Sequence, residues 1–309
     1  VSRHDGPVTP DPAYPSLADL VGSTPLARLQ RLPGPGAGIV LAKLEGDNPA
    51  GSVKDRPALS MIQAAEADGR IAPGDTLVEA TSGNTGIALA AIAAIKGYRM
   101  VLVMPAGSSR ERVLTMRAYG AEVVETDAAL GMEHARDTAE RLEAERGAVR
   151  LDQFANPANP RAHEERTGPE IWEQTAGTVT HVVSAMGTTG TITGMSRALK
   201  ALSADVTVIG AQPEPGSQIP GIRAWPPEYV PAIFDPTHID EVREVSRDRA
   251  AETTRALARE EGMLVGMSTG GAAAIALDVA RDNPGSTVVF IACDRGDRYL
   301  STDLFDPQG

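Results

Sequence analysis

The sequence has little cysteine and no long apolar run. Cys293 is the single cysteine among 309 residues, so no disulfide can form within the chain, which fits a reducing compartment. The longest apolar run, residues 87–95, is far too short to span a membrane. Residues 1–15 are polar, carry four prolines and contain no apolar segment of the kind found in signal peptides. We therefore expect a cytoplasmic protein with no membrane partner.

Basic clusters are lacking as well. Lys and Arg together number 29 against 41 Asp and Glu, which gives a formal net charge of −12. No stripe of lysine and arginine offsets the repulsion between such a chain and a phosphate backbone, so we expect no nucleic-acid partner. The five histidines and the cysteine lack the spacing of metal ligands, and we predict no metal. No Ser-His-Asp signature or nucleophile elbow is present.

Short β-branched runs alternate along the chain with longer Ala-, Leu- and Glu-rich stretches. The runs predict strands at residues 39–44, 76–80, 100–104, 122–126, 180–185, 206–211 and 287–293. The stretches predict helices at residues 56–67, 87–96, 110–119, 132–146, 192–202, 247–261 and 272–281. Strands that are apolar throughout are typical of parallel sheets covered on both faces. We therefore predict an α/β fold of about two domains, with a crossing near the breaker segment 154–161.

Lys54 lies in the segment Asn-Pro-Ala-Gly-Ser-Val-Lys-Asp-Arg at residues 48–56. It follows a turn-forming stretch and opens a predicted helix, so its side chain can reach into a cleft. A desolvated lysine amine has a lowered pKa and can form a Schiff base with a carbonyl group. The alternative is a solvated surface lysine, which is the commoner case.

Three loops rich in small polar residues each lead into a predicted helix. They are Thr-Ser-Gly-Asn-Thr-Gly at 81–86, Gly-Thr-Thr-Gly-Thr at 187–191 and Gly-Met-Ser-Thr-Gly-Gly at 266–271. Hydrogen-bond donors at the positive end of a helix dipole suit anions, at the sheet edge where α/β proteins bind ligands. The first loop suits a carboxylate and the second a phosphate. The alternatives are a capped turn, a flexible turn and close helix packing, respectively.

One helix-opening lysine and three donor-rich loops together predict a phosphorylated cofactor with a carbonyl group, and a carboxylate substrate. Pyridoxal 5'-phosphate with an amino acid fits this set. In order and spacing, the four segments resemble the signature loops of fold-type II pyridoxal-phosphate enzymes, and they are similar to those of the cysteine synthase (O-acetylserine sulfhydrylase) family. The resemblance runs from residue 20 to residue 301. Two further stretches, 220–226 and 293–302, look like the B-type branch of that family.

The resemblance implies two open, twisted, mostly parallel sheet domains flanked by helices, with the cofactor in the cleft between them. The smaller domain would comprise residues 48–158, with 1–25 as an N-terminal arm. The larger, cofactor-binding domain would comprise residues 26–47 and 159–309. A homodimer is also expected from the resemblance.

The resemblance makes Lys54 the Schiff-base lysine and the catalytic base. Asn84 would meet the ring hydroxyl of the cofactor, and Ser268 its pyridine nitrogen. Position 269 is a threonine where many relatives have serine, which leaves the assignment of Ser268 intact. The implied cofactor-binding residues are Lys54, Asn84, Gly187, Thr188, Thr189, Gly190, Thr191 and Ser268. The implied substrate-binding residues are Thr81, Ser82, Gly83, Thr85, Gln153, Arg223, Cys293 and Asp294.

The activity implied by the resemblance is a transferase reaction of cysteine biosynthesis. O-acetyl-L-serine loses acetate by β-elimination, and sulfide adds to the resulting aminoacrylate to give L-cysteine. Lys54 would remove the Cα proton and later return it. Arg223 at the entrance would attract anions, which is consistent with the B-type use of thiosulfate to make S-sulfocysteine.

Two other readings stay open at this point. One is a different β-replacement or elimination on the same scaffold, such as cystathionine β-synthase-like or serine/threonine dehydratase chemistry. The other is a non-catalytic partner subunit, for example of serine acetyltransferase. The second reading predicts a cofactor-free or inert protein, whereas every residue of the cofactor loops is intact.

Overall fold

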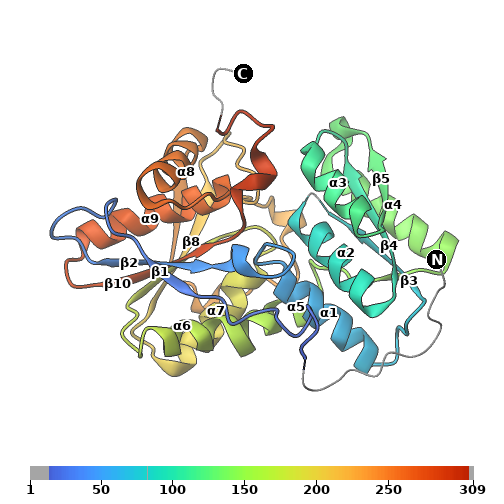
Figure 1. Ribbon diagram of the computed structural model, residues 1–309, viewed down its shortest axis with the longest axis horizontal. Helices are drawn as coiled ribbons and strands as arrows, with labels where there is room; N and C mark the ends of the chain where they lie inside the picture. Colours follow the sequence, from blue (N-terminus) through green and yellow to red (C-terminus); the bar gives the residue numbers. More distant parts are fainter. Residues whose placement is uncertain (1–13, 82, 306–309) are drawn as a thin grey trace.

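The computed structural model describes residues 14–81 and 83–305. Ser82, predicted to bind the substrate, lies outside the described residues, and so do residues 1–13 of the predicted N-terminal arm. The described chain forms two β-sheets, each flanked by helices, so the predicted α/β fold is confirmed (Figure 1).

The larger sheet has six strands in the order β1-β2-β10-β7-β8-β9. Only the short pairing of β1 with β2 is antiparallel, and the other pairings are parallel. Sequence patterns missed the edge strands β1 and β9, because β1 has three residues and β9 is mostly exposed and charged. The strands are β1 (Leu26–Arg28), β2 (Ile39–Leu44), β10 (Thr287–Ala292), β7 (His181–Ala185), β8 (Thr207–Pro213) and β9 (Glu241–Val245).

The smaller sheet has four parallel strands in the order β5-β4-β3-β6. Three of them were predicted, and the fourth, β6, has only two residues and no recognisable pattern. The strands are β5 (Glu122–Thr126), β4 (Arg99–Pro105), β3 (Thr76–Ala80) and β6 (Val149–Arg150).

Figure 1 shows α2, α3 and α4 with the smaller sheet, and α6 to α9 with the larger one, while α1 and α5 lie between them. Hydrophobic clusters cover both faces of each sheet, so Phe290 of β10 packs in one cluster and its neighbour Ile291 in another. The longer helices are α1 (Asp55–Ala67), α2 (Asn84–Lys96), α3 (Arg110–Ala118), α4 (Gly131–Arg146), α7 (Gly190–Leu202), α8 (Arg247–Glu261) and α9 (Met267–Asp282). No helix within the described residues is long and apolar enough to cross a membrane.

Three helices begin earlier than the sequence predicted. α2 begins at Asn84, α7 at Gly190 and α9 at Met267, where the predicted first residues were 87, 192 and 272. Glycine, serine and threonine favour turns and caps, so the patterns assigned these residues to loops. Among the predicted ligand-binding residues, Asn84, Thr85, Gly190, Thr191 and Ser268 therefore sit in the first turns of these helices.

The predicted breaker segment 154–161 is helical at its end. α5 (Ala158–Ala162) begins within it, followed by a π-helix (His163–Thr167) and α6 (Gly168–Gln174). None of these three was predicted. Prolines suit the first turn of a helix, which explains why Pro157 and Pro160 do not prevent α5 from forming.

Candidate active site

Lys54 lies where the N-terminus of α1 meets the segment that follows β10. Ser52 and Asp294 form an antiparallel bridge, and the backbone N–H of Val53 donates to the carbonyl oxygen of Cys293 at 2.8 Å. α1 begins directly after Lys54, as predicted within one residue. Residues far apart in the sequence thereby hold the lysine beside Cys293 and Asp294.

The surroundings of Lys54 favour its neutral amine. Burial lowers the pKa of Lys54, and Cys293, Asp294 and Glu45 act in the opposite direction without reversing it. Burial also raises the pKa of Cys293 to about 12, so this residue is a thiol at neutral pH. A neutral amine can act as a base or a nucleophile, whereas a neutral thiol is a poor nucleophile. The reactive group of the pair is therefore Lys54.

Asn84, the first residue of α2, is held at both ends of its side-chain amide. Its Nδ2 donates to Asp294 Oδ2, and its Oδ1 accepts from Arg298, both at 2.6 Å. Tyr299 also donates to Asp294 Oδ2 at 2.6 Å, while Oδ1 of Asp294 is buried without a hydrogen bond among the described residues. Arg112 of α3 donates to the Tyr299 hydroxyl at 2.7 Å.

This network places the predicted residue Asp294 and adds Arg298, Tyr299 and Arg112, to which the sequence analysis gave no role. Asp294, Arg298 and Tyr299 are buried. Asn84 and Arg298 are 214 positions apart, and no local pattern encodes that contact.

Residues of the 81–86 loop and Gln153 gather at the carboxyl end of β3. Thr81 Oγ1 accepts from the backbone N–H groups of Gly83 and Gly86 at 3.2 and 3.1 Å. Gln153 accepts from the Thr85 hydroxyl at 2.8 Å and donates to the carbonyl oxygen of Ala80 at 2.9 Å. Gln153 lies in a turn after β6.

The 187–191 loop enters α7 with an unusual backbone conformation. Thr189, which precedes the first residue of α7, has φ 70°, a left-handed conformation that is rare for a threonine and often found at functional sites. The first N–H groups of a helix have no partner within the helix, so those of α7 are available to an anion. The Trp225 indole donates to the carbonyl oxygen of Gly187 at 2.7 Å, and the backbone N–H of Arg223 donates to that of Met186 at 2.8 Å.

Ser268 lies between the chain around Gly221 and the Cys293 thiol. It lies in the first turn of α9 with 4% of its surface exposed, and it contacts the Cys293 thiol. Gly221 approaches it so closely that an added Cβ would lie 3.1 Å from the Ser268 hydroxyl. A Cβ added at Gly187 would likewise lie 3.0 Å from the carbonyl oxygen of Gly221.

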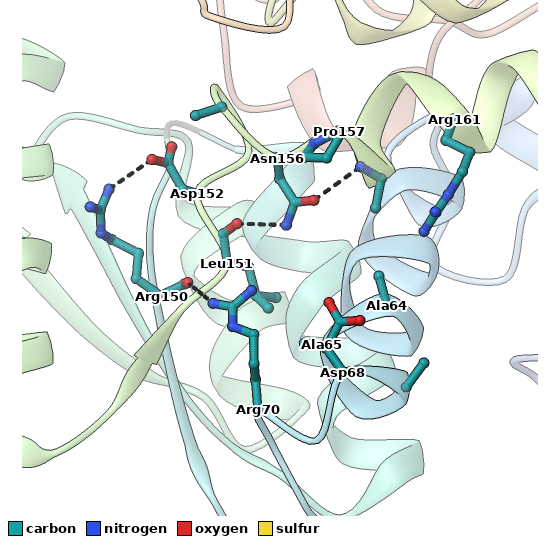
Figure 2. A pocket seen from close by; sticks show the side chains of 13 residues that line it. Ala64, Ala65, Asp68, Arg70, Arg150, Leu151, Asp152, Asn156, Pro157 and Arg161 are labelled. Carbon is teal, nitrogen blue, oxygen red and sulfur yellow. Dashed lines mark hydrogen bonds and ion pairs between the residues drawn. The ribbon is translucent and has the colours of Figure 1, made fainter.

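A cavity of about 420 Å³ lies elsewhere, between the last turns of α1 and the segment 150–161 (Figure 2). Arg70, Arg150 and Arg161 line it together with Asp68 and Asp152. None of the predicted site residues lines this cavity. The candidate site is defined instead by the segment after β10, which bridges to the chain beside Lys54, hydrogen-bonds Asn84 at the start of α2 and contacts Ser268 in the first turn of α9.

Comparisons with known proteins show the family of the chain. The family model described as pyridoxal-phosphate dependent enzyme matches residues 17–294. Cysteine synthase B of Pseudomonas aeruginosa is 58% identical over 296 residues, which cover 96% of this chain and 99% of that protein. Cysteine synthase B of Escherichia coli is 58% identical over 291 residues, covering 94% and 96%.

Solved structures give the same picture. The crystal structure of O-ureido-L-serine synthase matches with a TM-score of 0.91 at 41% identity, covering 96% of both chains. That of cysteine synthase from Entamoeba histolytica matches with a TM-score of 0.89 at 36% identity, covering 99% of this chain and 94% of that one. The chain therefore belongs to the family of pyridoxal-phosphate dependent enzymes. Within that family it is similar to cysteine synthase B over nearly its whole length, which confirms the predicted resemblance and cofactor.

Proposed function

We propose that the protein is a cysteine synthase, which forms L-cysteine and acetate from O-acetyl-L-serine and sulfide. The observation that carries the proposal is the position of Lys54, a desolvated amine at the start of α1 that is held against the segment after β10. The 58% identity to cysteine synthase B supports the choice of reaction within the family. We further propose that the enzyme works in the cytoplasm as a homodimer, as the sequence led us to expect.

The residues present fit pyridoxal phosphate. The unpaired N–H groups at the start of α7 suit its phosphate, with the residues from Gly187 to Thr191 around it. The Asn84 amide uses one of its two N–H groups on Asp294, which leaves the other for the ring hydroxyl. Ser268 offers a neutral hydroxyl to the ring nitrogen. When bound, the cofactor supplies an electron sink that stabilises negative charge developing at the substrate Cα.

The chain's own residues then position the substrate and move its proton. Thr81 accepts two backbone hydrogen bonds, so its hydroxyl hydrogen can be donated to the substrate carboxylate. Gln153 retains a second side-chain N–H for the same carboxylate. The Lys54 amine takes the Cα proton as acetate leaves and returns it after sulfide has added, so one group acts as base and then as acid.

We also propose two domains with the boundaries that the resemblance implied. The segment 48–158 contributes all four strands of the smaller sheet, and residues 26–47 with 159–309 contribute all six strands of the larger one. Lys54 belongs to the first unit and the segment after β10 to the second, so the proposed site lies at their junction.

The visible absorption spectrum of the purified protein tests the function. The wild type should carry a yellow chromophore that borohydride reduces, and Lys54→Ala should lose both the reducible band and the synthesis of cysteine. Product analysis with O-acetylserine, O-phosphoserine and serine separates cysteine synthesis from the other β-replacement and elimination reactions. A wild-type protein that makes no cysteine from O-acetylserine and sulfide would refute the proposed function, and a colourless one that still makes cysteine would refute the role of Lys54.

A further inference from the structure

A buried histidine lies directly behind the 187–191 loop. His163 opens the π-helix between α5 and α6, and none of its surface is exposed. Its Nε2 lies 3.3 Å from the hydroxyl oxygen of Thr191, and its Nδ1 lies 2.9 Å from the hydroxyl oxygen of Thr167. Both ring nitrogens therefore face threonine hydroxyls, one of which belongs to the proposed phosphate loop.

The backbone fixes the distance between the histidine and the loop. α7 packs against the segment from α5 to the π-helix through two glycines. A Cβ on Gly190 would collide with the side chain of Asn159, and one on Gly194 would collide with the carbonyl oxygen of Pro160 and lie 2.9 Å from His163 Cβ. π-helical turns are rare and frequently occur at functional sites. The imidazole is therefore held in place by packing on two sides.

The imidazole of His163 is neutral. Burial lowers its pKa well below the ordinary value, and the positive charge of Arg56 acts in the same direction. A neutral imidazole has one N–H, so one ring nitrogen donates and the other accepts. The tautomer of His163 therefore decides which way the Thr191 hydroxyl hydrogen points.

We propose that His163 is a positioning residue for the cofactor phosphate and that it carries its proton on Nε2. In this tautomer Nε2–H donates to the Thr191 oxygen, and Nδ1 accepts from the Thr167 hydroxyl. The Thr191 hydrogen is then free to be donated to a phosphate oxygen, which can only accept. The opposite tautomer would bind that hydrogen to the ring and turn the oxygen lone pairs of Thr191 toward an anion. The inference rests on the proposed role of the 187–191 loop.

Binding of two aldehydes to the cofactor-free protein tests the inference. Pyridoxal phosphate carries the phosphate group and pyridoxal lacks it. His163→Leu should weaken pyridoxal phosphate about tenfold to a hundredfold, the range for a hydrogen bond to a charged group, and pyridoxal less than about threefold. His163→Gln, which restores an N–H donor, should recover most of the loss. Thr191→Val should show the same selectivity, and the double variant should lose no more than Thr191→Val alone.

Thr193 of α7 offers a matched control, because it is fully buried in the same helix but lies outside the loop. Thr193→Val should affect both aldehydes equally. Equal losses for both aldehydes in the His163 variants, or additive losses in the double variant, would overturn the proposal. The tautomer is measured independently by ¹⁵N NMR of the wild-type holoenzyme, in which His163 should be protonated on Nε2. Protonation on Nδ1 sinks this inference alone, whereas a wild type without the reducible chromophore sinks the proposed function.

Discussion

Replacing Glu79 by glutamine should stabilise the protein at neutral and mildly alkaline pH. Glu79 lies on β3 with 2% of its surface exposed, and it accepts the backbone N–H groups of Asp152 and Gln153 at 2.9 and 3.4 Å. Burial, together with the nearby Asp152 carboxylate, raises the pKa of Glu79 from 4.5 to about 8. At pH 7 the carboxyl group keeps its proton in the folded protein and loses it in the unfolded chain.

The sign of the effect follows from this proton balance. Between pH 4.5 and about 8 the folded protein binds more protons at Glu79 than the unfolded chain does, so stability falls as the pH rises. The stability that the protonated Glu79 carboxyl group contributes is therefore fully present below pH 4.5 and is lost by about pH 8. One pKa unit corresponds to about 1.4 kcal/mol, so the loss at pH 7 is on the order of 3 kcal/mol. Glutamine is neutral at every pH and removes this dependence.

Urea unfolding at about pH 5, 7 and 8.5 measures the free energy of unfolding of both proteins. Relative to wild type, Glu79→Gln should gain stability at the two higher pH values, and its curve should be flatter across the range. Glu125→Gln on β5 is the matched control, because that side chain is 44% exposed and should leave the pH dependence unchanged. Asp152→Asn should reduce the pH dependence by lowering the pKa of Glu79. Parallel pH profiles for wild type and Glu79→Gln would refute the reasoning.

Two further substitutions test the neighbourhood of Lys54 and the choice of sulfur donor. Arg56→Met should lower the free energy of unfolding by about 3–5 kcal/mol, because it leaves the buried Glu45 carboxylate, with which Arg56 pairs at 2.7 Å, without its partner. As a control, Arg141→Met removes an exposed ion pair and should change the free energy of unfolding by less than about 1 kcal/mol. Equal effects of the two substitutions in urea unfolding would contradict a stabilising role for the buried pair. Arg223, which lies over the Trp225 ring at 5.3 Å, is proposed to draw anions to the site, so Arg223→Ala should reduce kcat/KM for thiosulfate much more than for sulfide, and equal losses would rule this role out.

The sequence predicted those parts of the fold that local patterns encode. β2, β3 and β5 have the predicted bounds, because each is a short β-branched run between turn residues. β6 escaped prediction because two residues form it only by pairing with β3. The starts of α2, α7 and α9 were placed too late because small polar residues at a helix start look like loop residues.

In the candidate site, too, the sequence predicted only the features that local patterns encode. The three loops rich in small polar residues were recognisable because backbone access to an anion needs such residues in consecutive positions. Arg298 was not recognisable, because its partners Asn84 and Ala50 lie more than 200 positions away. His163 gave no signal either, since its neighbours depend on a π-helical turn and on the close approach of α7.

The bridge between Ser52 and Asp294 has a consequence for the order in which the protein matures. Ribosomes synthesise Lys54 before β10 and the two residues that follow, which desolvate it. Until they dock, the amine stays solvated and keeps the ordinary basicity of a lysine. The nascent chain therefore carries an unreactive lysine until β10 has been made, and it acquires an aldehyde-reactive amine only when these two segments meet.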